Sequence, residues 1–596
     1  MNAPRVSLRT FCLLLFGISV VASIGCPPAD QTALNNDSKS MDSKSKRLQE
    51  SPQESPNQTS TDDPSADSLP SPQEEIDNPT APPPESPANG AAQVDAPIPT
   101  STNDDTAPRA ASIAAPTDEQ TSSQEELFAG WEDPDAVLFL TGKQYGYIEP
   151  CGCTGLANQK GGLMRRHTLF KQLQARGWDL VPLDGGNQVR RFGMQPVIKF
   201  TRTFEILAQL MDYDGIALGP DDLRLDAIEL YQTVINYQQG DKNPLLSANV
   251  KVLDDLVPTH RVINVGGLKI GVTAVLGDEF HEGIHNPDVE IVSVSEGLKQ
   301  VLPKLQAESC DLYVLIAYAS IEASEEIAKQ FPNFDILLTT GGDGEPTREP
   351  KAIESEGHTT QMILSGYKGM HVGVVALNKS DSGVSIKYQR VPLDARFEDS
   401  EEVKTVFTAY QEQLKTLGLN GLDIRPVAHP SGAEFVGSET CGDCHSIAYD
   451  IWKNGVDGNG GPHAHATLSL TEPNERNWVQ RHFDPECLSC HVTGWNPQKY
   501  FPYESGYLSL EKSSYLTGNG CENCHGPGSK HVAAENGELD LTTEQMLAIK
   551  DAIRVTKEEA RNNLCMECHD LDNSPDFHVE GAWEKYWPQI EHIGTD

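Results

Sequence analysis

Cys441-Gly-Asp-Cys444-His445 is the first of four pentapeptides with the pattern Cys-x-x-Cys-His near the C-terminus of this chain. The other three are Cys487-Leu-Ser-Cys490-His491, Cys521-Glu-Asn-Cys524-His525 and Cys565-Met-Glu-Cys568-His569. Two cysteines three positions apart can present both thiols to the two vinyl groups of one porphyrin, and the next histidine can reach its iron. The spacing therefore predicts four covalently bound c-type haems with these histidines as proximal ligands. The alternative is structural zinc, but zinc sites need no histidine after every second cysteine.

The same region offers six further histidines as ligands for the opposite face of the irons: His463, His465, His482, His531, His578 and His592. Its only methionines are Met546 and Met566. Bis-histidine ligation is therefore favoured, and without methionine ligands the reduction potentials should be lower than in His/Met cytochromes.

Three stretches around these histidines resemble the tetrahaem cytochrome c family of hydroxylamine-oxidising electron chains. They are Trp452…His463-Ala464-His465-Ala466, Cys521-Glu-Asn-Cys-His-Gly-Pro-Gly-Ser-Lys-His531 and Ser574-Pro-Asp-Phe…Trp587-Pro-Gln-Ile-Glu-His592. The resemblance implies a small, mostly helical and loop-rich domain, with His463, His531 and His592 as distal ligands. It also implies one five-coordinate haem. Either this fourth site is open, or His465, His482 or His578 closes it.

The N-terminus has the pattern of an export signal. Arg5 and Arg9 precede an apolar run, residues 12–22, that is too short for a comfortable membrane span. Ser23-Ile24-Gly25-Cys26 resembles a bacterial lipobox, so we expect residues 1–26 to be a lipoprotein signal and Cys26 to carry the lipid. Ordinary cleavage that leaves Cys26 free is the alternative. Either route predicts a protein on the periplasmic or cell-surface side, and lipidation would anchor it to a membrane.

Residues 27–125 are dominated by Ser, Pro and acidic residues and contain few side chains able to form a core. The composition predicts a disordered tether. The whole chain has 46 basic and 87 acidic side chains and a formal net charge of −41. This charge argues against nucleic acid as a partner, and we expect redox proteins instead.

Residues 126–417 alternate between apolar strand-like runs and segments of helical period. The predicted strands are 136–141, 179–183, 215–218, 262–276, 311–317, 334–339 and 362–377, and the clearest helices are 163–176, 197–211 and 296–307. This alternation predicts an α/β layered domain.

This domain resembles the metallophosphoesterase domain of the 5'-nucleotidase and UDP-sugar hydrolase family in the order of its motifs. The metal ligands are replaced: Lys143 stands for the family's first aspartate, Tyr145 for its histidine, and Asn187 for the bridging carboxylate. Gly219-Pro220-Asp221-Asp222, Ala317-Tyr318-Ala319-Ser320 and Thr340-Gly341-Gly342-Asp343 stand where the family has histidine motifs. A dinuclear site needs carboxylates and imidazoles, so we expect a non-catalytic relative. The alternative is a metal site rebuilt from Asp184, Asp221, Asp222 and Asp343.

Two local features of this domain have no assigned role. Gly161-Gly162 opens a helix that carries Arg165 and Arg166, and Arg190 and Arg191 follow the next strand. We expect solvated surface arginines, and the alternative is an anion-binding pocket. Cys151 and Cys153 are expected to be a structural or redox pair.

Residues 434–596 complete the chain as the predicted tetrahaem domain. The sequence thus predicts an exported, membrane-tethered multihaem cytochrome that carries electrons, with a phosphoesterase-like scaffold or recognition module. Two other functions stay open. One is a metal-dependent phosphoesterase with a haem appendage, and the other is a reductase of small nitrogen or sulfur compounds at an open haem.

Overall fold

The computed structural model describes residues 127–150, 160–191, 193–254, 256–472, 479–570 and 573–592, all within one compact unit. The predicted signal, the predicted tether, Cys26, Cys151 and Cys153 lie outside the described residues. Below, the α/β part means residues 127–421 and the C-terminal part means residues 422–592.

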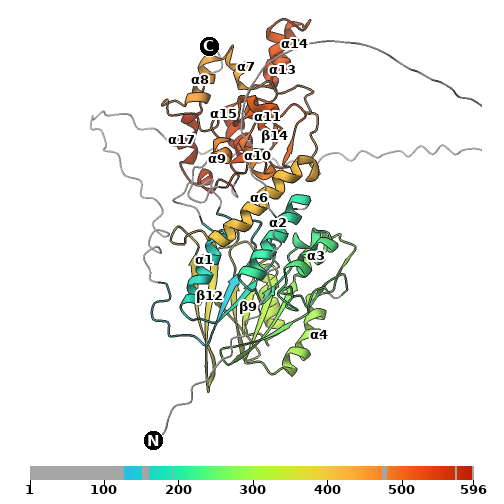
Figure 1. Ribbon diagram of the computed structural model, residues 1–596, viewed down its shortest axis with the longest axis vertical. Helices are drawn as coiled ribbons and strands as arrows, with labels where there is room; N and C mark the ends of the chain where they lie inside the picture. The colour runs from blue at the N-terminus through green and yellow to red at the C-terminus, as the bar shows by residue number, and fades with distance from the viewer. Residues whose placement is uncertain are drawn as a thin grey trace, which may run out of the picture. The chain divides into compact units, whose positions relative to one another are not determined.

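The α/β part contains two main sheets (Figure 1). The first has the order β13-β12-β1-β2-β3, and the second has the order β10-β11-β9-β8-β6-β5. Strands β1, β2 and β3 run parallel, as do β6, β8, β9 and β11. The strands of these sheets are β1 (Ala136–Thr141), β2 (Leu180–Asp184), β3 (Gly215–Ile216), β5 (Arg261–Val265), β6 (Leu268–Leu276), β8 (Leu312–Tyr318), β9 (Ile336–Thr339), β10 (Lys351–Ser355), β11 (His358–Leu364), β12 (His371–Ser380) and β13 (Gly383–Pro392).

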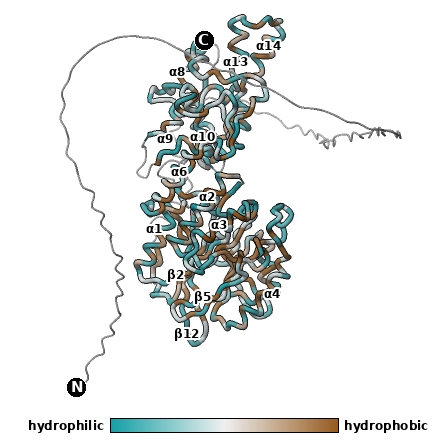
Figure 2. Tube along the Cα trace, turned by 45° about the vertical axis from the view of Figure 1, so that its right-hand side comes forward, coloured by the Kyte–Doolittle hydropathy of each residue, from teal (hydrophilic) through white to brown (hydrophobic). Residues whose placement is uncertain are grey.

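Helices cover the outer face of each sheet, which gives four layers. Side chains alternate between the faces of a strand, so Val137 and Phe139 of β1 pack against helices while Leu138 and Leu140 pack against the second sheet. The first sheet is covered by α1 (Gly162–Ala175), α2 (Met194–Glu205), α3 (Ala227–Tyr237) and α6 (Glu401–Gly421), and the second by α4 (Val294–Ala307) and α5 (Ile321–Gln330). The predicted α/β layered class is confirmed, and Figure 2 shows hydrophobic segments along its interior.

Two predicted strands are each two strands in the structure. The run 262–276 is broken at Gly266 and Gly267 into the hairpin β5–β6, and a Cβ at Gly266 would lie 1.6 Å from the Asp135 carbonyl oxygen. The run 362–377 ends at Leu364 and resumes at His371. Both breaks contain glycines with positive φ, a conformation that other residues rarely adopt.

The C-terminal part consists of short helices and loops, as predicted. Its helices are α7 (Ser438–Gly442), α8 (Ser446–Asn454), α9 (Leu468–Thr471), α10 (Pro485–His491), α11 (Leu510–Ser513), α12 (Cys521–His525), α13 (Ser529–Glu535), α14 (Thr543–Ala552), α15 (Lys557–Glu559), α16 (Cys565–Cys568) and α17 (Ala582–Tyr586), with the two-residue strands β14 (Trp495–Asn496) and β15 (Phe501–Pro502). Its protein core is a small cluster around Leu488, Val492 and Trp495. Within the described residues no helix has both the length and the apolarity that a membrane crossing requires.

Candidate functional site

Each Cys-x-x-Cys-His motif begins inside a short helix, and the first motif runs past the end of its helix. The helices are α7, α10, α12 and α16. Residues three apart in a helix share one face, so the two cysteines of the second, third and fourth motifs turn to the same side. The local fold therefore presents thiol pairs in the way that attachment to one porphyrin edge requires.

The structure places the rings of three motif histidines close to the rings of other histidines. The ring centres are 6.3 Å apart for His445 and His531, 6.1 Å for His569 and His463, and 6.0 Å for His525 and His592. Two imidazoles that bind one metal ion through their Nε2 atoms at about 2.0 Å each have ring centres about 6 Å apart. The three spacings fit an iron between each pair of rings.

Three of the four motif histidines are also oriented for metal binding through Nε2. The Nδ1 of His491 donates to the Ala466 carbonyl (2.7 Å), and the Nδ1 of His525 donates to the Ile553 carbonyl (2.8 Å). The Nδ1 of His569 lies 3.1 Å from the Ser574 hydroxyl. An engaged Nδ1 leaves Nε2 for a metal and fixes the direction of the ring.

His491 differs from the other motif histidines, because among the described residues no histidine ring pairs with it in this way. His578 donates from Nε2 to the His569 carbonyl (2.7 Å), and the His482 ring lies against Phe483 with 4.8 Å between ring centres. His465 lines the cavity that contains His491.

That cavity has a volume of about 930 Å³, at the upper end of the range for cofactor pockets. Its wall includes the second and fourth motifs, represented by Cys487, Cys490, His491, Cys565, Cys568 and His569. The α/β part also lines this cavity, through residues 145–150, 189–191, 196, 199, 407, 410 and 411. Residues from both parts of the chain therefore line one space.

A second polar cluster lies at the carboxyl ends of β1, β2, β3 and β8, where sites in α/β sheets usually form. Lys143 donates from Nζ to the Gly342 carbonyl (2.6 Å). Burial lowers the pKa of Lys143, although Asp343 opposes this shift. Asn187 donates to Asp221 Oδ2 (3.0 Å) and to the Tyr318 hydroxyl (2.9 Å).

The aspartates of this cluster bond to the protein itself. Asp184 pairs with Arg166 at 3.4 Å, and both side chains are fully buried. Asp222 accepts bonds from the backbone N–H groups of Asn187 (2.7 Å) and Gln188 (2.8 Å). Burial raises the pKa of Asp222 to about 7, against the effect of these donors. Across the described residues, no group of three or more His, Cys, Asp or Glu side chains could hold a metal ion.

The prediction of solvated surface arginines is wrong for Arg165 and Arg166. Both are buried, because α1 packs this face against the sheet, and Arg165 pairs with Asp399 at 3.3 Å. Arg190 is exposed and lies over the Tyr145 ring at 5.6 Å. Sequence reasoning did not identify Arg166 as the partner of Asp184, because the two residues lie on different elements.

Comparisons with known proteins divide the chain in the same way. A family model described as "Cytochrome c554 and c-prime" matches residues 440–526. Cytochrome c-554 of Nitrosomonas europaea is 26% identical over an alignment of 172 residues that covers 27% of this chain and 68% of that protein.

The α/β part is similar to 5'-nucleotidases. The snake venom 5'-nucleotidase of Crotalus adamanteus is 22% identical over an alignment of 294 residues that covers 44% of this chain and 48% of that protein. The solved 5'-nucleotidase precursor from Thermus thermophilus is 17% identical with a TM-score of 0.41, over 51% of this chain and 62% of that one. The chain thus spans about half the length of its curated 5'-nucleotidase relatives. The predicted fusion of a cytochrome c-like region with a 5'-nucleotidase-like region is confirmed.

Proposed function

We propose that this protein is an exported electron carrier with four covalently bound c-type haems. The observation that carries this proposal is the set of three histidine ring pairs, 6.0–6.3 Å apart, that involve three of the four motif histidines. Bound haem supplies a one-electron carrier whose potential depends on its axial ligands and surroundings.

The residues divide the work as follows. The eight cysteines of the motifs form the thioether bonds: Cys441, Cys444, Cys487, Cys490, Cys521, Cys524, Cys565 and Cys568. His445, His491, His525 and His569 are the proximal ligands. His531, His592 and His463 are the distal ligands of the first, third and fourth sites, in agreement with the ring pairs.

The decisive experiment is a pyridine haemochrome count together with iron and zinc analysis of the purified exported protein. We expect four haems and four irons per chain. A protein without a c-type Soret band, or with zinc bound at the cysteines, would overturn the proposal.

A second function is favoured by His491, whose ring pairs with no other histidine ring among the described residues. A haem with one histidine ligand can bind a small nitrogen or sulfur compound at its sixth position. We expect a high-spin electron paramagnetic resonance signal from one haem, and carbon monoxide binding after reduction. Only low-spin signals that integrate to four haems, with no carbon monoxide adduct, would leave electron transfer alone.

The α/β part is proposed to lack phosphoesterase activity, because Arg166 and Lys143 bring positive charge to the polar cluster at the carboxyl ends of β1 and β2. We expect no phosphate release from AMP with added manganese. Robust phosphate release from AMP that is abolished by Asn187→Ala would support the alternative function, a metal-dependent phosphoesterase.

The remaining parts of the proposal rest on the sequence. Residues 1–26 direct export, Cys26 carries a lipid anchor, and residues 27–125 tether the domains 126–417 and 434–596 to a membrane on its periplasmic or cell-surface side. The partners are redox proteins, and the acidic charge argues against nucleic acid. Mass spectrometry of the mature N-terminus tests the lipid directly.

A further inference from the structure

The α/β part makes direct side-chain contacts with α10, the helix that carries Cys487, Cys490 and His491. Asp484 is the N-cap of this helix and accepts a bond from the backbone N–H of Glu486 (3.0 Å). The same carboxylate accepts bonds from Gln195 on α2 (2.7 Å) and from Gln411 on α6 (2.8 Å). Two helices of the α/β part therefore hold the beginning of α10.

Glu486, the residue before Cys487, forms a second group of contacts. Its carboxylate pairs with Lys199 of α2 and lies 3.6 Å from Arg191. Burial opposes the charge on Lys199, but Glu486 and Asp484 outweigh it and raise the pKa of Lys199. Lys199 thus stays protonated beside the attachment cysteine, and it also lines the cavity that contains His491.

The segment before α10 is anchored in the α/β part as well. Arg481 pairs with Glu149, and its guanidinium lies 5.5 Å from the centre of the Phe407 ring. Val479 belongs to the hydrophobic core of the α/β part, and Phe483 packs against that core. Apolar packing and charged contacts thus act on the same short segment.

We propose that the α/β part positions the second haem, the one attached at Cys487 and Cys490. It fixes α10 through Asp484 and Glu486 and supplies one wall of the haem cavity, and so it sets the reduction potential of that haem. This inference rests on the proposed function, because it needs a haem at that motif. It gives the α/β part a specific role in electron transfer.

Charge near a haem changes its potential in a direction that can be stated in advance. A positive side chain disfavours the oxidised iron, which carries one more positive charge than the reduced iron. Removing Lys199 also leaves the Glu486 carboxylate less compensated, which further favours oxidation. Both effects lower the potential of the nearby haem.

The test is a potentiometric titration of the full-length protein with Lys199→Met. We expect one of the four midpoint potentials to fall by about 59 mV, which for one electron corresponds to a decrease of about tenfold in the equilibrium constant for reduction. Arg202→Met is the matched control on the same helix, since Arg202 pairs with Glu205 inside the α/β part at 2.8 Å. The control should leave all four potentials unchanged.

A second pair of variants removes contacts without changing charge. Gln411→Leu breaks the bond to Asp484, whereas Gln413→Leu on the same helix breaks a bond from Arg202 (3.0 Å). We expect only Gln411→Leu to alter the electron paramagnetic resonance signal of one haem. If all four haems are bound and neither Lys199→Met nor Gln411→Leu changes the potential or the spectrum of one haem, the proposal that the α/β part positions the second haem is wrong. If the haems are missing from the parent protein, the proposed function itself fails.

Discussion

Arg166 and Asp184 form an ion pair in which both side chains are fully buried. An ion pair of this kind is costly to break, since removing one partner leaves the other charge buried and unpaired. Arg166→Met should therefore lower the free energy of unfolding by about 3–5 kcal/mol, measured by urea denaturation.

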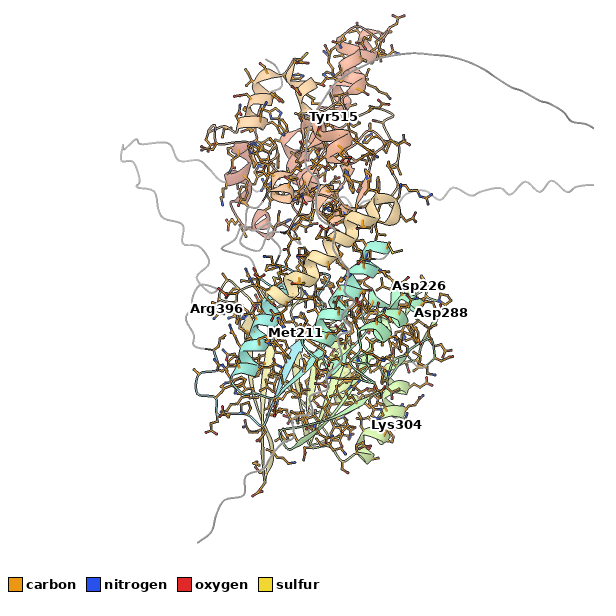
Figure 3. All side chains as sticks on the ribbon, viewed as in Figure 1. Met211, Asp226, Asp288, Lys304, Arg396 and Tyr515 are labelled. Atoms are coloured by element: carbon orange, nitrogen blue, oxygen red, sulfur yellow. The ribbon has the colours of Figure 1, made fainter. Side chains whose placement is uncertain are left out.

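Arg396→Met is the control, since Arg396 lies on the surface (Figure 3) and pairs with Asp394 at 2.9 Å. Exposed pairs contribute about 0–1 kcal/mol. Equal effects of the two substitutions would contradict a structural role for the buried Arg166–Asp184 pair.

His371, at the start of β12, makes stability depend on pH. Burial lowers the pKa of His371 from 6.5 to about 3, with smaller effects from Arg390 and Lys160. The unfolded chain takes up the proton first, so the stability of the neutral form is complete above pH 6.5 and is lost as the pH falls toward 3. This group should contribute a slope of up to about 1.4 kcal/mol per pH unit in that window. Unfolding of His371→Gln between about pH 7 and pH 4 should show a shallower slope, and an unchanged slope would exclude His371 as the source.

At the level of elements, α12 joins the first and third motifs through a glutamate inside the motif itself. Glu522 is 3% exposed, and its carboxylate accepts bonds from the backbone N–H groups of Val436 (2.9 Å), Gly437 (2.8 Å) and Gly528 (2.8 Å). A glutamine accepts through one oxygen only and would bring an N–H group against these donors.

Glu522→Gln should therefore lower the free energy of unfolding by about 1–3 kcal/mol. Glu567 is a glutamate of the fourth motif that stands one position later than Glu522 does in the third, and it is exposed, so Glu567→Gln is a control with an effect near zero. Thermal or urea unfolding of the two variants measures the difference, and equal stabilities would contradict a stabilising role for the buried Glu522 carboxylate.

The same comparison of elements shows what sequence can predict. The predicted strand 136–141 is β1 itself, because six consecutive buried residues leave a clear apolar signal. The hairpin at Gly266 and Gly267 is not predicted, although the glycine pair is visible, because apolar residues continue on both sides of it. The role of the motif histidines as haem ligands can be predicted, because the attachment motif consists of five consecutive residues.

Contacts between distant segments could not be predicted. Gln195 and Asp484 are 289 positions apart, and neither residue belongs to a motif. The only local sign is the pair Asp484-Pro485, the N-cap and the first residue of the attachment helix α10, which is typical of a helix start. Contacts of this kind depend on how the helices pack, which no short stretch of sequence encodes.

At the scale of the whole molecule, these distant contacts predict how the chain unfolds. All described residues belong to one compact unit, and α10 is fixed by α2 and α6 through Asp484 and Glu486. The long strands all lie in the α/β part, so far-ultraviolet circular dichroism of the sheet reports on that part and haem absorbance reports on the C-terminal part. We expect both signals to change at one urea concentration, because coincident transitions indicate cooperative unfolding. The double variant Lys199→Met/Gln411→Leu should separate the two midpoints, whereas Arg202→Met/Gln413→Leu should keep them together. Two separate transitions in the parent protein would mean that the contacts at α10 are too weak to couple the parts.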